Sequence, residues 1–129
     1  MQLKLLLDTH LLLWAAEGEG LPMEAASLIE DDANQLVFSA ASIWEVAIKS
    51  SLGRSDFRVD PLRLHRALIA NQYEELPVSG EHASAVARLP SVHRDPFDRL
   101  LVAQALTAGL TLLTADARLS QYPGLIRIV

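Results

Sequence analysis

Four acidic residues stand at the end of an apolar run or inside one, where an unpaired charge is costly: Asp8, Glu45, Asp98 and Asp116. Carboxylates that gather in one place repel one another unless a cation lies between them. Hard divalent ions that prefer oxygen ligands, such as Mg²⁺ and Mn²⁺, suit that position. Such ions can supply the nucleophilic water, the charge neutralisation and the leaving-group stabilisation that phosphodiester hydrolysis needs. These residue types therefore suit metal-dependent hydrolysis if the fold brings them together.

The segment HRDPFDRLLVAQA (93–105) places two carboxylates at the predicted start of a helix. Asp95 is expected to be the N-cap with Pro96 at the first helical position, so that Asp98 falls at the third. Both carboxylates gain from the positive end of the helix dipole. For Asp95 this structural explanation and a place in a metal site remain equal alternatives.

The capping explanation is weaker for Asp98, because its helix face is otherwise apolar. That face continues through Leu101, Val102 and Ala105. A carboxylate on the core-facing side needs a cation or a hydrogen-bond donor. Arg94 and Arg99 are candidate partners in the sequence, although either can equally be a solvated surface charge.

The other three acids also have structural explanations. Glu45 can pair with Lys49 four residues later, a common and weak helix contact. Asp8 can cap the helix that follows it, and Asp116 can cap the turn ADARLS with Thr114 as a competing cap. A common location of all four acids would favour a metal site over four separate caps and pairs.

Apolar runs and turn residues predict alternating strands and helices. Strands are expected at 3–9, 34–40, 74–79, 110–116 and 124–129. Helices are expected at 10–20, 21–31, 41–53, 60–72, 80–90 and 95–109, with a loop at 54–60. This alternation indicates an α/β sandwich with a mostly parallel sheet, in which Pro77 favours an edge position for the third strand. The carboxyl ends of parallel strands share one edge, and all four acids are expected there.

Length and composition restrict the classes of protein that fit. With 129 residues and 50% hydrophobic residues, one domain over 1–129 is expected. No apolar run reaches the ~18 residues of a membrane span, and the N-terminus lacks signal-peptide features, so a cytoplasmic location is expected. The absence of cysteine excludes disulfides, and the dispersed histidines give a zinc site little support.

Charge is unevenly distributed along the chain. Residues 1–48 hold one basic residue against eight acidic ones, a net charge of −7, whereas residues 49–129 hold ten against eight, a net charge of +2. The total of −5 argues against a protein that binds nucleic acid through charge alone. It is compatible with bound cations or with a basic partner.

Four motifs occur in one order along the chain: LLLDTHLLLW, FSAASIWEVAIK, HRDPFDRLLVAQA and LLTADARL. With these motifs, essentially the whole chain resembles a PIN domain of the VapC toxin type. The resemblance implies a three-layer α/β/α fold with sheet order 3-2-1-4-5 and a ribonuclease dependent on Mg²⁺ or Mn²⁺. By match to the family pattern, the catalytic, metal-binding quartet would be Asp8, Glu45, Asp98 and Asp116.

The resemblance also bears on the residues around the quartet. Asp95 belongs to a DPFDR variant seen in one branch of the family and is a candidate fifth metal residue. Thr114 matches a hydroxyl residue that accompanies the quartet and is a candidate substrate-binding residue. Further matches near the pocket are Thr9, Ser39 and Lys49. We expect basic side chains to contact RNA phosphates, with solvated surface as the alternative for each: Lys49, Arg94, Arg99 and Arg118.

Relatives of this type form homodimers and are silenced by a cognate VapB-like antitoxin that lies across the pocket. Apolar surface for such contacts is expected at 10–14, 22–32 and 60–72, with ordinary core as the alternative. Trp14 and Trp44 are interpreted as packing residues rather than base-stacking platforms.

Two other functions are considered. A phosphoacceptor receiver domain has a similar size and an acidic Mg²⁺ pocket, but it needs an aspartate after strand three and a lysine after strand five. Here the third strand ends in PVSG, and the last lysine is Lys49. A catalytically silent PIN-like binding module is the second alternative, although all four quartet positions hold acids.

Overall fold

The computed structural model describes residues 2–53 and 59–129. Its five-stranded sheet has the order β3-β2-β1-β4-β5, and every neighbouring pair is parallel. The strands are β1 (Lys4–Leu7), β2 (Gln35–Ser39), β3 (Glu74–Leu76), β4 (Thr111–Thr114) and β5 (Ile126–Ile128). The predicted order 3-2-1-4-5 and the edge position of the third strand are confirmed. Flavodoxin-like folds, which include receiver domains, have the order 2-1-3-4-5, so the receiver alternative does not fit.

Helices follow the predicted segments closely. They are α1 (Thr9–Glu17), α2 (Met23–Glu30), α3 (Ala40–Ser51), α4 (Pro61–Ala70), α5 (Gly80–Ala85) and α6 (Pro96–Ala108). The helix predicted at 80–90 is divided into α5 and a short 3₁₀ turn, Val86–Arg88, and a second 3₁₀ turn spans Ala117–Gln121. The predicted loop at 54–60 lies mostly outside the described residues.

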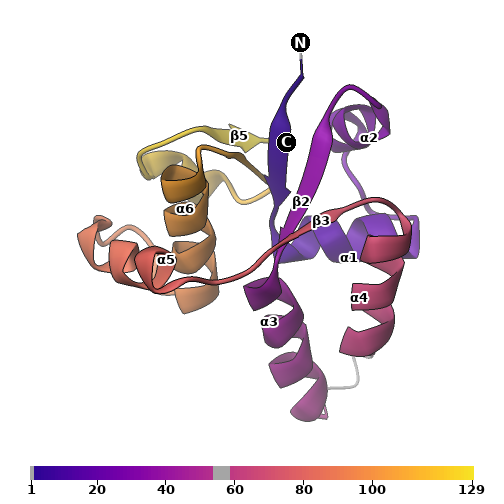
Figure 1. Ribbon diagram of the computed structural model, residues 1–129, viewed down its shortest axis with the longest axis horizontal. Coiled ribbons are helices and arrows are strands. Elements are labelled where there is room, and N and C mark those ends of the chain that lie inside the picture. Colours follow the sequence, from indigo (N-terminus) through magenta and orange to yellow (C-terminus); the bar gives the residue numbers. More distant parts are fainter. Residues whose placement is uncertain (1, 54–58) are drawn as a thin grey trace.

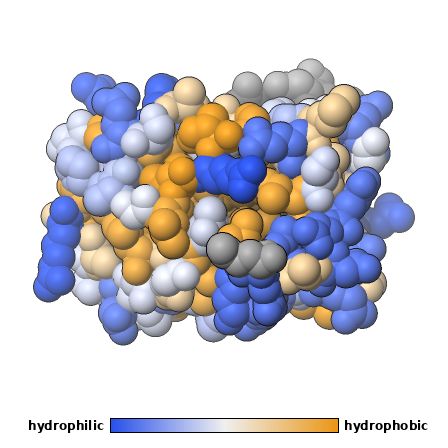
Figure 2. Space-filling model, turned by 90° about the horizontal axis from the view of Figure 1, so that it is seen from above, coloured by the Kyte–Doolittle hydropathy of each residue, from blue (hydrophilic) through white to orange (hydrophobic). Residues whose placement is uncertain are grey.

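The sheet separates two apolar clusters, which makes the fold three-layered (Figure 1). Successive residues of β1 alternate between the clusters, as the two-residue period of a strand requires. Leu5 and Leu7 pack with residues from α1, α2, α3 and α4, whereas Leu6 packs with residues from α6. Figure 2 shows the end of the molecule where β1 begins. Apolar side chains gather over the middle of this face, and the majority of the hydrophilic side chains lie near its rim.

Local sequence signals fix the helix that holds two of the candidate residues. Asp95 caps α6, Pro96 occupies its first position, and Gly109 ends it in the left-handed conformation at φ 69°. The predicted apolar face is buried, with Leu101 and Val102 each 1% exposed. The first turn of α6 is thereby held beside the carboxyl ends of the strands.

Within residues 2–53 and 59–129, none of the helices combines the length and the apolar character needed to cross a lipid bilayer.

Candidate functional site

Asp8 directly follows β1 and lies beside the end of β4. Its carboxylate accepts a hydrogen bond from the Thr114 hydroxyl at 2.5 Å and another from the backbone N–H of Leu11 at 3.0 Å. The predicted capping role of Asp8 is therefore confirmed for α1. Asp8 is nevertheless 4% exposed, and burial raises its pKa although both hydrogen bonds oppose the shift. A cap on a helix end does not require such burial.

Glu45 lies on α3, and its side chain contacts Thr9, the residue after Asp8. Its Oε1 accepts a hydrogen bond from the Thr9 hydroxyl at 2.7 Å, and its Oε2 lies 2.8 Å from Lys49 Nζ. The predicted pair with Lys49 is thus present. Glu45 is only 4% exposed, so the pair is not the usual solvated contact of a surface helix.

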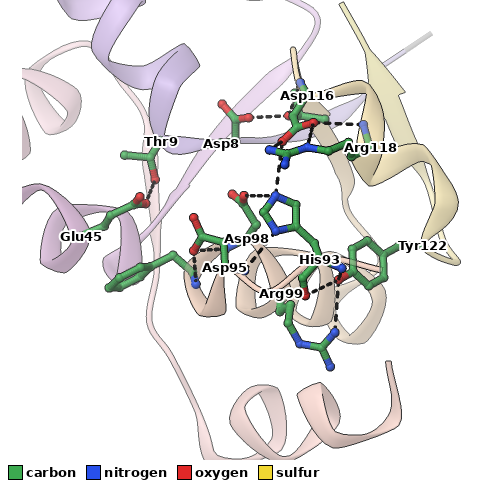
Figure 3. A network of polar contacts seen from close by, with 12 residues as sticks. Asp8, Thr9, Glu45, His93, Asp95, Asp98, Arg99, Asp116, Arg118 and Tyr122 are labelled. Atoms are coloured by element: carbon green, nitrogen blue, oxygen red, sulfur yellow. Dashed lines mark hydrogen bonds and ion pairs between the residues drawn. The ribbon is translucent and has the colours of Figure 1, made fainter. Parts of the chain in front are cut away.

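Asp98, in the first turn of α6, is surrounded by other carboxylates. Burial raises its pKa to about 7, followed in importance by negative charges nearby: Asp95, Asp8, Glu45 and Asp116. Four acids from separate segments therefore act on one carboxyl group. The structure brings together the four predicted quartet residues, with Asp95 as a fifth (Figure 3).

Asp95 caps α6, as predicted. One carboxylate oxygen accepts from the backbone N–H of Phe97 at 2.8 Å and of Asp98 at 3.4 Å. Its negative charge is the largest contribution after burial to the raised pKa of Asp98. Asp95 therefore caps α6 and also belongs to the acidic cluster, the group formed by Asp8, Glu45, Asp95, Asp98 and Asp116.

Asp116 caps the turn after β4 and forms an ion pair with Arg118. Nε of Arg118 lies 3.0 Å from Oδ1 of Asp116, and Nη2 lies 2.8 Å from Oδ2. The hydrogen bonds from Arg118 lower the pKa of Asp116 to about 2. Asp116 is therefore already ionised in the pH range in which Asp98 loses its proton.

His93 is a site residue that sequence reasoning missed. Its Nε2 lies 3.4 Å from Oδ2 of Asp98 and 3.5 Å from Oδ2 of Asp116. One possible ligand atom from each of these three residues lies within 4.8 Å of the other two. The sequence signal is its position two residues before the helix cap; the dispersion of the four histidines along the chain does not indicate which of them lies near the acids.

The candidate RNA-binding residues occupy different environments. The guanidinium of Arg99 donates to the carbonyls of Pro90 and Val86 and to the Tyr122 hydroxyl, away from the acids (Figure 3). Arg94 is exposed and has no ion pair with another described residue. The side chain of Lys49 is 35% exposed beside Glu45.

The remaining predicted residues are divided between buried and exposed positions. Ser39 is fully buried and caps α3, and Trp14 packs partly buried against the core. Trp44 contacts Phe97 edge-to-face with 5.3 Å between ring centroids, but it is 61% exposed. Trp44 therefore packs only in part, and its interpretation as a packing residue rather than a base-stacking platform stays a prediction.

The sequence and the fold of this chain are similar to those of known proteins. The PIN domain family matches residues 5–125. Ribonuclease VapC22 of Mycobacterium tuberculosis is 33% identical over 119 residues, which cover 91% of this chain and 90% of that protein. The VapBC2 structure from Rickettsia felis, bound to a promoter DNA fragment, has a TM-score of 0.72 at 14% identity, with 98% of each chain covered. A toxin–antitoxin complex from Klebsiella pneumoniae has a TM-score of 0.65 at 19% identity, with 95% of this chain and 94% of that chain covered. The chain belongs to the PIN-domain family, and within it to the VapC type.

Proposed function

We propose that this protein is a divalent-metal-dependent endoribonuclease and the toxin of a VapBC-type pair. The main support is the location of Asp98, whose half-buried carboxyl group lies near four other acidic residues. Four independent caps or surface pairs would not require such proximity. The 33% identity to Ribonuclease VapC22 supports RNA as the substrate.

The side chains fit a hard divalent cation. All the grouped acids offer oxygen ligands, and repulsion among them falls when a cation binds. We assign Mg²⁺ or Mn²⁺ to Asp8, Asp98 and Asp116, with Asp95 as a further candidate. A bound ion would neutralise phosphate charge and lower the pKa of its water.

The protein residues have distinct proposed roles in hydrolysis. Thr114 fixes one oxygen of Asp8, which orients that carboxylate for metal binding. Glu45, oriented by Thr9 and Lys49, binds metal or positions the attacking water. We propose that three basic side chains contact RNA phosphates, because each lies in or next to a segment that holds one of the grouped acids: Lys49, Arg94 and Arg118. Arg99 is proposed to hold the start of α6, since its donors are engaged elsewhere.

A VapB-like antitoxin is the proposed inhibitory partner. An acidic pocket favours a partner that presents Arg or Lys to the carboxylates in a charge-assisted contact. A groove of about 850 Å³ lies between α1, α2 and α4, the helices in which apolar contact surface was predicted. The related folds from toxin–antitoxin complexes support this partner. A homodimer and a cytoplasmic location are proposed from the resemblance to VapC-type toxins alone.

A circular RNA tests this proposal, because only an endonuclease can cut a substrate without ends. We expect the wild type to linearise it with Mg²⁺ or Mn²⁺ and to leave it intact with a chelator. D98N should abolish cleavage while the circular dichroism spectrum is unchanged. Failure of the wild type to cut a panel of circular RNAs with either ion would support the silent binding module.

A further inference from the structure

The imidazole of His93 has a fixed donor and acceptor arrangement. Its Nδ1 lies 3.0 Å from the backbone N–H of Asp95, which can only donate. Nδ1 must therefore present its lone pair, and in the neutral ring the proton lies on Nε2. This assignment follows from the backbone of the α6 cap and not from the charges of the neighbouring acids.

The other ring nitrogen is buried and lacks a hydrogen-bond partner among the described residues. An unsatisfied buried N–H is costly, so a nearby acceptor is expected to move toward it. Oδ2 of Asp98 at 3.4 Å and Oδ2 of Asp116 at 3.5 Å are the acidic oxygens in reach. Figure 3 shows the ring between these two carboxylates.

The same tautomer argues against His93 as a metal ligand. Histidine binds metals through the lone pair of a neutral ring nitrogen. The lone pair of His93 points to the Asp95 backbone, whereas the nitrogen that faces the acids bears hydrogen. The close grouping of His93, Asp98 and Asp116 is thus better explained by donation from His93 to the carboxylates than by ligation.

The backbone of His93 is held from outside the acidic cluster. Its N–H donates to the Tyr122 hydroxyl at 2.9 Å, and Nη1 of Arg99 donates to the same hydroxyl oxygen at 3.2 Å. Tyr122 is 4% exposed. The backbone of His93 is therefore held by contacts that need not change when the acids bind a cation.

We propose that His93 is a positioning residue that donates from Nε2–H to the carboxylates of Asp98 and Asp116 and orients them for the divalent cation. The proposed donation is argued from the ring geometry and the short distances to both carboxylates, whereas its effect on metal binding rests on the proposed function. Residues that hold metal ligands in place commonly change metal affinity by about 10–100-fold when replaced.

The tautomer can be measured directly in the metal-free protein. Long-range ¹H–¹⁵N spectra of histidine-labelled protein, recorded at alkaline pH, distinguish a protonated Nε2 from a protonated Nδ1. We expect protonated Nε2 for His93, unchanged on addition of Mg²⁺, with H93Q used to assign the signal. Protonation at Nδ1, or loss of the Nε2 proton when Mg²⁺ binds, would overturn the proposal. This measurement is independent of RNA cleavage.

Two substitutions separate donation from packing. Both remove the ring, but the amide of H93Q can reach the Nε2 position, whereas that of H93N reaches only the Nδ1 position. By calorimetric Mn²⁺ titration, H93N should bind about 10–100-fold more weakly than wild type. H93Q should recover most of that loss, with the circular dichroism spectra of all three proteins alike.

Equal Mn²⁺ affinity in wild type, H93N and H93Q would contradict a positioning role. Equal losses of affinity in both variants would contradict donation from Nε2, because they would show a role of the ring that neither amide replaces. Absence of Mn²⁺ binding to the wild type would refute the metal role of His93 together with the proposed function. In that case the tautomer measurement still decides whether Nε2 carries the proton that the proposed donation requires.

Discussion

Arg118 forms a two-point ion pair with Asp116, through Nε at 3.0 Å and Nη2 at 2.8 Å. Both carboxylate oxygens of a proposed metal-binding residue are thus in contact with a cation supplied by the chain itself. The side chain of Arg118 is 68% exposed, and exposed ion pairs contribute little to stability. Arg118 can therefore leave Asp116 at small cost when a divalent ion binds.

We expect R118Q to bind Mn²⁺ more tightly than wild type, because the competing guanidinium is removed. Calorimetric titration measures the change. R127Q is the matched control, since Arg127 pairs with Glu24 in another exposed ion pair and its loss changes net charge equally. Equal affinity gains in R118Q and R127Q would show a general charge effect and contradict local competition.

The raised pKa of Asp98 predicts that metal-free protein loses stability as pH rises. The folded state keeps a proton on Asp98 up to about pH 7, whereas the unfolded chain releases it near 3.8. Across that window the unfolded state binds fewer protons, so the free energy of unfolding falls with pH. At ~1.4 kcal/mol per pKa unit the contribution is at most about 4 kcal/mol.

Thermal melts in chelator should show this loss through comparison with D98N. The melting temperature of D98N should rise relative to that of wild type between about pH 4 and pH 7. A constant difference between the two proteins across this range would mean that Asp98 ionises normally.

Asp8→Asn separates metal binding from helix capping. Asparagine caps about as well as aspartate, so in chelator D8N should melt at the same temperature as wild type or higher. An ion at a hundredfold excess over Kd stabilises the native state by ~2.7 kcal/mol. D8N should lose most of the rise in melting temperature that Mn²⁺ causes in wild type.

D60N provides the control for that comparison. Asp60 caps α4 with a 3.0 Å hydrogen bond from the Leu62 backbone, outside the acidic cluster. Its substitution should leave the Mn²⁺-induced rise unchanged. A full rise in D8N would remove Asp8 from the metal site.

Asp95 is predicted to matter less for cleavage than Asp98. D95A removes the cap of α6 and should cost ~1 kcal/mol of stability with partial activity retained. D95N keeps the cap and should cleave RNA near the wild-type rate. If D95N is as inactive as D98N in the same cleavage assay, Asp95 binds the metal and the proposed division of roles is incorrect.

The sequence predicted those features that depend on local patterns. Apolar runs, capping residues and the alternation of strands with helices along the chain indicated a parallel sheet. They also placed Asp8 and Asp116 at the carboxyl ends of its strands. The contact between His93 and Asp116 was not visible, because it joins the loop before α6 to the turn after β4. The inward engagement of Arg99 and the exposure of Trp44 likewise depend on tertiary packing, which residue spacing does not report.

The central claim is that these acids form one cation site. A crystal of the protein soaked in Mn²⁺, with data collected for anomalous scattering from manganese, tests it most directly. We predict an anomalous peak in contact with carboxylate oxygens of Asp8, Asp98 and Asp116, with no bond from His93 to the ion. Ordered carboxylates with no peak among them, or a peak only elsewhere on the protein, would contradict the claim.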